Sequence, residues 1–250
     1  MIKAPLASPL ALALALPVLL SACATIVPPS PFAYGKKGDL VDFRYSWSAE
    51  ASAIPALARR FQADLDSTFR DTLAGATADR ASAARDKRPF SGHQFAFDWT
   101  TAGNTPGLLS LKGAMSSFTG GAHGNRGNKA LLWDRRTGRA IAPASLLAAP
   151  DKLDALLRPA YCTALSAERS RRRGTPTAAT DLFGDCPTLG QLSLVPADTN
   201  HDRRFDTLRL IADPYVAGPW VEGDYVVDVP VTARFVTALK PMWRRDFAAR

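Results

Sequence analysis

The sequence contains few of the side chains on which most hydrolytic and metal-dependent sites rely. Among 250 residues there are three cysteines and three histidines, His93, His123 and His201. There is no Gly-x-Ser-x-Gly motif for a nucleophilic serine, and no histidine spacing that suits zinc. Paired carboxylates such as Asp64 and Asp66 fall on the polar face of a predicted helix. We therefore expect no catalytic residue, no bound metal and no cofactor.

A hydrophobic run long enough to span a membrane is also missing. The apolar run Leu10–Leu20 is shorter than the roughly 18 residues that a membrane-spanning helix needs. It ends in Leu20-Ser21-Ala22-Cys23, which resembles the lipobox of bacterial lipoproteins. We predict that residues 1–22 are a signal peptide and that Cys23 carries the lipid anchor to the membrane. The alternative is an ordinary secretory signal with a chance cysteine.

The residue after the predicted lipidation site bears on where the protein resides. Ala24, rather than aspartate, resembles the pattern of lipoproteins that are sent to the outer membrane. We therefore expect an outer-membrane lipoprotein of the bacterial cell envelope that faces the periplasm.

Cysteine is scarce enough for its pairing to be predicted. With Cys23 assigned to the lipid, Cys162 and Cys186 remain, an even pair in a chain expected to reach an oxidising compartment. We predict a disulfide between them, which would stabilise the fold by roughly 3–4 kcal/mol.

Basic residues outnumber acidic ones, 31 to 23, for a net charge of +8, of which the signal peptide removes one, Lys3. This balance favours anionic surfaces but is too dispersed to indicate a nucleic-acid partner. The run Arg169, Arg171, Arg172 and Arg173 follows a predicted helix. We interpret it as a solvated helix C-terminus, with contact to an anionic polymer as the alternative.

Hydrophobic periodicity predicts an α+β fold of antiparallel sheets with packed helices. Residues 23–38 are rich in Pro, Ser and Gly and are predicted to be a flexible tether. Alternation predicts strands at residues 40–47, 95–99, 109–115, 130–134, 206–213 and 225–231. Helical spacing predicts helices at residues 54–73, 151–165 and 232–247, with Gly75 ending the first and Pro159 kinking or splitting the second. Residues 76–87 are predicted to be a loop or a short surface helix.

The segment Ser117–Asn125 places three glycines around one histidine. It joins two predicted strands, yet a plain hairpin needs fewer glycines than this. Because glycine adopts backbone angles that other residues avoid, we predict a close backbone approach that presents His123 at the bend. Gly120, Gly121, His123 and Asn125 are therefore candidate binding residues. The alternative is a tight connection in which the histidine only bonds the backbone.

The segment Asp198–Asp206 has oxygen-bearing side chains at its first, third, fifth and ninth positions, which resembles the start of a calcium-binding loop. Arg203 stands where such a loop needs glycine, and Arg209 where it needs an acidic ligand. We therefore predict an Asx-rich turn before a strand and no calcium site.

Several segments together resemble one family of bacterial envelope domains. Similarity to the domain seen in the PdaC deacetylase and the RsiV anti-sigma factor lies in Leu108–Leu111, Phe118–Gly124, Asp134 and Thr137-Gly138. Similarity to its C-terminal partner domain lies in Asp213-Pro214-Tyr215, Gly218-Pro219, Glu222-Gly223 and Val229-Pro230.

The resemblance implies two related α+β subdomains, a PdaC-type one at residues 39–148 and an RsiV-type one at residues 149–250. It also implies a recognition surface, to which we assign Tyr215 as a further candidate binding residue. In RsiV the extracellular region binds lysozyme, and in PdaC the domain accompanies a separate catalytic domain. We expect neither activity to carry over.

These features predict a non-enzymatic, lipid-anchored envelope protein whose recognition domain binds a wall polymer such as peptidoglycan, or a protein partner. One alternative is a lysozyme-binding inhibitor or sensor, although so basic a chain matches a basic enzyme poorly. The other alternative is an envelope hydrolase that uses His123 with an acidic residue from elsewhere in the chain.

Overall fold

The computed structural model describes Met1, residues 28–178 and residues 180–250. Apart from Met1, the predicted signal peptide lies outside the described residues, as does Cys23. None of the helices in the described part of the chain is both long and apolar enough to cross a membrane.

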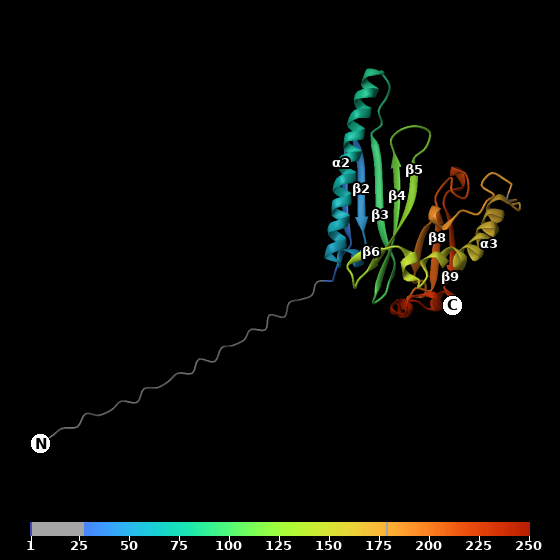
Figure 1. Ribbon diagram of the computed structural model, residues 1–250. Coiled ribbons are helices and arrows are strands. Elements are labelled where there is room, and N and C mark those ends of the chain that lie inside the picture. Colours follow the sequence, from blue (N-terminus) through green and yellow to red (C-terminus); the bar gives the residue numbers. More distant parts are fainter. Residues whose placement is uncertain (2–27, 179) are drawn as a thin grey trace.

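The first half of the chain forms one six-stranded sheet with a long helix on one face (Figure 1). Its strands lie in chain order: β1 (Phe32–Lys37), β2 (Val41–Trp47), β3 (His93–Asn104), β4 (Leu108–Phe118), β5 (Asn125–Asp134) and β6 (Arg139–Ile141). Two helices, α1 (Ala49–Ser52) and α2 (Pro55–Arg85), connect β2 to β3. The predicted α+β class is confirmed, but the sheet is mixed, because β2 and β3 are parallel. A parallel pair needs a long crossover, which α2 supplies.

Alternating side chains of β2 and the apolar stripe of α2 build the first core. Phe43 and Tyr45 are buried on the face of the sheet that packs against Phe61 and Leu65 of α2. The helix does not end at Gly75, and the predicted loop or short helix at residues 76–87 is wrong. Its alanine-rich continuation to Arg85 favours a helix.

The predicted tether is wrong for its last part. Residues Phe32–Lys37 form β1, which pairs antiparallel with β2 at the edge of the sheet. Phe32 stacks on Trp47 with ring centroids 3.8 Å apart, so this strand is fixed by aromatic packing. The prolines and glycines around β1 indicated a flexible tether, so composition did not predict this short strand.

The second half forms a smaller antiparallel sheet of β7 (Ser193–Ala197), β8 (Thr207–Ala212) and β9 (Tyr225–Pro230). The helix α3 (Leu153–Arg173) packs against it, and α4 (Ala233–Ala238) follows it. Short 3-10 helices are η1 (Pro143–Leu146), η2 (Pro150–Lys152), η3 (Leu189–Gln191), η4 (Trp220–Glu222) and η5 (Pro241–Asp246). The predicted disulfide is confirmed: Cys162 and Cys186 are bonded, with Cα atoms 5.6 Å apart.

Two helix predictions need correction. Pro159 does not split α3, which continues to Arg173; Pro159 is exposed, so water can bond the carbonyl left without an N–H partner. The predicted terminal helix at residues 232–247 is only α4 followed by η5. Pro241 disfavours helical angles at Lys240, the residue before it.

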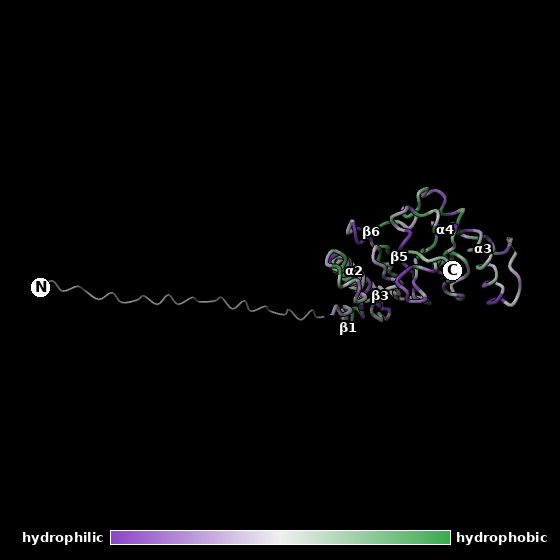
Figure 2. Tube along the Cα trace, turned by 90° about the horizontal axis from the view of Figure 1, so that it is seen from below, coloured by the Kyte–Doolittle hydropathy of each residue, from purple (hydrophilic) through white to green (hydrophobic). Residues whose placement is uncertain are grey.

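Strands β4 and β5 serve both halves of the molecule. Leu109 and Leu131 belong to the first core, whereas their neighbours Leu108 and Leu132 belong to the second. Successive side chains of a strand point to opposite faces, so this sheet separates the two cores and contributes side chains to both. Seen from below, α2 and α3 lie toward opposite ends of the molecule with β5 between them (Figure 2).

The C-terminal segment is attached to the β3–β4 turn through one buried carboxylate. Asp246 is fully buried and accepts hydrogen bonds from the Thr105 hydroxyl at 2.6 Å and the Gly107 N–H at 2.8 Å. A Cβ at Gly107 would lie 2.7 Å from an Asp246 oxygen, which is why this turn position requires glycine.

Asp246→Ala should lower the free energy of unfolding by roughly 1–3 kcal/mol, because it leaves the buried Gly107 N–H without a partner. Urea denaturation measures the change, and Arg245→Ala at the exposed neighbouring position is the control. Equal stability of the two variants would contradict the assigned role of Asp246.

Candidate functional site

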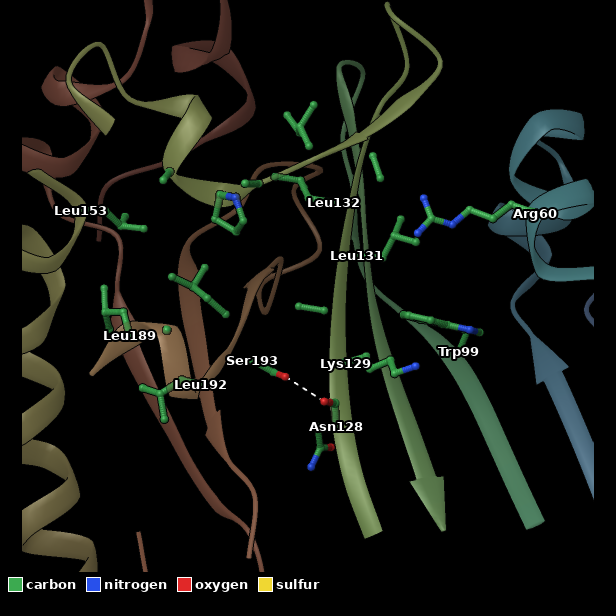
Figure 3. Close-up of a pocket in the computed structure, with 18 of the residues that line it drawn as sticks. Arg60, Trp99, Asn128, Lys129, Leu131, Leu132, Leu153, Leu189, Leu192 and Ser193 are labelled. Carbon is green, nitrogen blue, oxygen red and sulfur yellow. Dashed lines mark hydrogen bonds between the residues drawn. The ribbon is translucent and has the colours of Figure 1, made fainter. Parts of the chain in front are cut away.

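A cleft of about 630 Å³ lies along the outer edge of β5 (Figure 3). It is lined by α2 and Trp99 on one side, by the β5 segment 128–132, and by residues of β6, η1, α3, η3 and β7 on the other. Its size falls in the range of roughly 300–1,000 Å³ typical of ligand sites. We take this cleft as the candidate binding site.

The cleft exists because β5 is paired on its outer side at only part of its length. β6 pairs with residues 132–134 of β5 and then leaves the sheet at Pro143. Further along β5, the Asn128 N–H donates to Asp213 Oδ1 at 2.9 Å, and the Ser193 hydroxyl donates to the Asn128 carbonyl at 2.9 Å. The second half of the chain therefore provides hydrogen-bond partners for the outward-facing N–H and C=O of Asn128.

Between these two points lies Ala130. Asn128 turns its N–H and C=O away from β4, and residues two apart on a strand face the same way, so Ala130 also points outward. β6 pairs with β5 only from Leu132 onward, and within residues 28–178 and 180–250 no turn, loop or side-chain hydrogen bond involves the Ala130 N–H or C=O. The residue is exposed in the cleft, so one backbone donor and one acceptor are available to a ligand.

Two cations stand on the α2 side of the cleft. Arg60 of α2 and Lys129 of β5 are both exposed and both line the cavity. Neither forms an ion pair with any described carboxylate, and the Lys129 ammonium lies 5.4 Å from the ring centroid of Phe97. Both are therefore available to an anionic group.

Among the residues that the structure describes, Asp64 is the only carboxylate that lines the cleft, and it is hydrogen-bonded to a residue of the first core. Asp64 accepts the Tyr45 hydroxyl at 2.6 Å, and Tyr45 accepts the indole N–H of Trp99 at 3.1 Å. Burial and the bond to Asp64 raise the pKa of Tyr45 far above its usual range, so Tyr45 remains a donor. With Arg60, Lys129 and Asp64 as its charged groups, the cleft lining is cationic by one charge.

The opposite side of β5 is apolar. Figure 3 shows Leu153, Leu189 and Leu192 on this side, across the strand from Arg60 and Lys129. All three leucines are partly exposed, as are Ile141 and Pro143 beside them. The cleft therefore has a cationic side and an apolar side, separated by the open backbone of Ala130.

The predicted glycine segment forms the β4–β5 hairpin loop, away from this cleft. Gly120 and Gly121 have φ of +105° and +97°, and a Cβ at either would meet nothing within 4 Å. Their conformation requires glycine, rather than a close approach to other atoms. Asn125 begins β5 and lines a second hollow of about 380 Å³ with Arg126 and Trp220.

His123 and Tyr215 are both exposed, and no described contact joins them. The His123 ring stacks on Trp220 at 4.3 Å, and its Nδ1 lies 2.9 Å from the Gly124 carbonyl. No described carboxylate bonds His123. Tyr215 lies in the turn after β8 with φ of +70°, where its N–H donates to the Gly218 carbonyl.

Sequence reasoning missed the residues that shape the cleft. In the sequence Asp213 belongs only to the segment Asp213-Pro214-Tyr215 that resembles the family, yet its carboxylate joins the two halves through Asn128. Arg60 lies in the predicted helix at residues 54–73, and nothing in the sequence selects it from the other charged residues there. Ala130 begins the strand predicted at residues 130–134, and Lys129 lies just before it. The unequal lengths of β5 and β6 leave no signal in the sequence.

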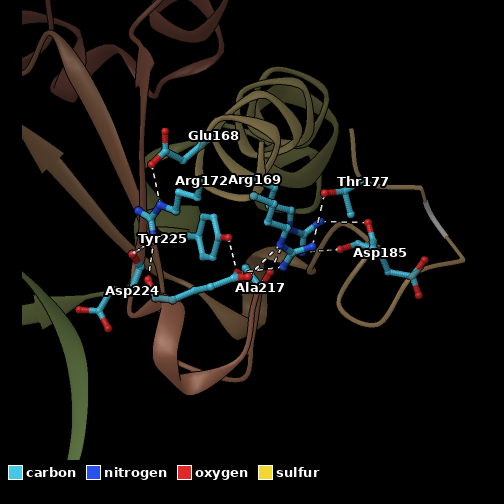
Figure 4. A network of polar contacts seen from close by, with 11 residues as sticks. Glu168, Arg169, Arg172, Thr177, Asp185, Ala217, Asp224 and Tyr225 are labelled. Atoms are coloured by element: carbon cyan, nitrogen blue, oxygen red, sulfur yellow. Dashed lines mark hydrogen bonds and ion pairs between the residues drawn. The ribbon is translucent and has the colours of Figure 1, made fainter. Parts of the chain in front are cut away.

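The predicted solvated arginine run is instead mostly structural (Figure 4). Arg169 is 2% exposed and donates to the carbonyls of Ala217, Gly184 and Asp185 at 2.9–3.0 Å. Arg173 pairs with Glu222 at 2.9 Å, and Arg172 donates to two backbone carbonyls. These arginines fasten the C-terminal turn of α3 to the disulfide loop and to the segment before β9.

The same helix end provides a pH-dependent contribution to stability. Hydrogen bonds from Arg171, and then those from Arg172, lower the pKa of Glu168 to about 2 despite partial burial. Because this lies below the ordinary value of 4.5, the pairing stabilises the fold fully above pH 4.5 and is lost as pH falls toward 2.

In Glu168→Gln the free energy of unfolding should therefore depend less steeply on pH between 4.5 and 2 than in the parent chain. Urea denaturation at a series of pH values measures both slopes. Identical slopes would contradict a depressed pKa at Glu168.

In the oxygen-rich segment 198–206, the side-chain oxygens accept hydrogen bonds from backbone N–H groups of the same segment. Asp198 accepts from the N–H groups of Asp202 and Arg203, at 3.2 and 2.9 Å. Asp206 accepts from the Thr199 N–H at 3.1 Å. Among the residues that the structure describes, no group of three or more His, Cys, Asp or Glu side chains is placed to hold a metal ion.

Comparisons with known proteins agree with this fold. Residues 36–126 match the family model described as deacetylase PdaC. A crystal structure of a DUF3298 family protein from Pseudomonas aeruginosa PAO1 superposes with a TM-score of 0.54 at 16% identity. The match covers 90% of this chain and 99% of that one. A DUF3298 family member from Bacteroides fragilis gives 0.56 at 12% identity, covering 87% and 95%.

The predicted PdaC resemblance is thus confirmed over residues 36–126. The resemblance to RsiV-like proteins is supported for the fold, through the DUF3298 structures. No curated protein sequence matches the chain.

His123→Ala should lower the free energy of unfolding by less than about 1 kcal/mol, because water can bond the exposed Gly124 carbonyl once the ring is gone. Trp220→Ala removes the ring that contacts both His123 and Arg126 and should cost more, on the order of 1–3 kcal/mol. Chemical denaturation compares the two. A larger loss in His123→Ala would make the histidine a structural element of the loop.

Proposed function

We propose that this protein is a non-enzymatic binding protein of the bacterial cell envelope and that the β5 cleft is its recognition site. The observation that carries the proposal is the cleft's composition. Arg60 and Lys129, which form no ion pair with a described carboxylate, lie across β5 from the apolar side of the cleft. The N–H and C=O of Ala130 lie between them. This combination of apolar lining and a few directed polar groups is typical of recognition sites.

An envelope location is supported from two directions. The Cys162–Cys186 disulfide is consistent with a chain that folds outside the cytoplasm. The sequence Leu20-Ser21-Ala22-Cys23 supports a lipid anchor in the outer membrane. The partner would then be a wall polymer or another envelope protein.

Binding is favoured over hydrolysis by the surroundings of His123. The hollow lined by its neighbour Gly124 and its stacking partner Trp220 has no carboxylate in its described lining. The Nδ1 atom is already within hydrogen-bond distance of a backbone carbonyl. General acid–base catalysis needs a second positioned group, for which this loop offers no candidate.

Two neighbouring arginines of α2 allow a matched test. Arg60 lines the cleft, whereas Arg59, also exposed, lines a different hollow near Trp133. The detergent-solubilised full chain is immobilised and exposed to envelope extract and to purified peptidoglycan. Arg60→Glu should weaken capture of the wild-type partner about tenfold, equal to about 1.4 kcal/mol.

The control Arg59→Glu carries the same change of charge and should bind as the parent chain does. An equal loss of binding in both variants would show that the effect comes from the change in net charge and not from the cleft. No loss in either would exclude the cleft as the binding site.

A further inference from the structure

We propose that the β5 cleft binds an extended polypeptide segment in which one apolar residue is flanked on both sides by acidic residues. The segment would form a one-residue antiparallel bridge with Ala130. This inference rests on the proposed function and specifies the chemistry of the partner.

The length of the open edge limits how much backbone can pair. β6 occupies the outer side of β5 as far as residue 132, and Ser193 and Asp213 occupy it at residue 128. Four residue steps of a strand span about 13 Å. The gap therefore holds about three residues of an extended chain, of which only the middle one faces the Ala130 N–H and C=O.

The orientation follows from the strand that already lies in this position. β6 runs antiparallel to β5 and ends where the cleft begins. Continuing the same arrangement places the N–H and C=O of the bound middle residue against those of Ala130, as in a hydrogen-bonded antiparallel pair.

Strand geometry then assigns the side chains. Residues directly opposite each other share a face, so the middle side chain lies on the Ala130 face, toward Leu189 and Leu192. Its two neighbours point to the opposite face, where Lys129 and Arg60 stand. Charge complementarity therefore favours acidic residues on both sides of an apolar one.

A blocked seven-residue peptide with glutamate, leucine and glutamate at its centre tests this arrangement. Titrated into the isotope-labelled full chain, it should bind saturably, with the Ala130 amide among the most shifted NMR signals. The same peptide with lysines in place of both glutamates should bind at least about tenfold more weakly.

Backbone methylation separates the bridge from side-chain attraction. N-methylation of the central leucine removes the donor to Ala130 and should weaken binding about tenfold. N-methylation of the following glutamate, whose N–H points away from β5, should leave binding within about twofold. Equal effects of the two methylations, or the reverse order, would overturn the bridge.

Ala130→Pro complements the peptide series. It removes the edge N–H without breaking a β4–β5 hydrogen bond, and proline is tolerated at such edge positions. Peptide binding should be lost while the thermal unfolding midpoint stays close to that of the parent chain. Unchanged peptide affinity in a folded variant would contradict the proposal.

The failure of this inference can be told from failure of the proposed function. If no peptide binds but Arg60→Glu still loses the envelope partner or peptidoglycan and Arg59→Glu does not, the cleft remains the binding site. In that case the polypeptide assignment is wrong. If Arg60→Glu loses nothing, both proposals fail.

Discussion

The outward-facing backbone of β5 is the constraint on which both the architecture and the candidate site depend. Backbone N–H and C=O groups need partners, and a sheet edge offers a row of them. At residues 132–134 the partner is β6, and at Asn128 the partners are Asp213 and Ser193. The edge that joins the two halves is therefore also the edge that stays open at Ala130.

A feature of this structure could be predicted from the sequence when it depends on residues close together along the chain. Alternation in β2 and the stripe of α2 are local, and the disulfide required only two cysteines and a compartment; all three were predictable. β1 was missed because Pro and Gly surround it. The parallel pairing of β2 with β3 was missed because the sequence of the connecting helix does not fix which strand the chain pairs with on its return, or in which direction.

The arginine run shows why composition is a weak guide to binding surfaces. Four arginines near the end of α3 contribute half the numerical excess of positive charge, yet Arg169 is buried and Arg173 is paired with Glu222. Arginine's planar donor fork suits it to several carbonyls at once. The cations that line the described cleft are instead two isolated residues, Arg60 and Lys129, which an analysis of charge runs would not select.

The boundaries of the family match bear directly on function. Residues 36–126 contribute Arg60, Phe61, Asp64 and Trp99, which form part of the cationic and aromatic side of the cleft. Lys129, Ala130 and every leucine that lines the cavity lie beyond residue 126. The cleft is thus completed by the second half of the chain, and its specificity depends on how Asp213 and Ser193 hold the two halves together. Residues 36–126 by themselves therefore do not contain the complete cleft.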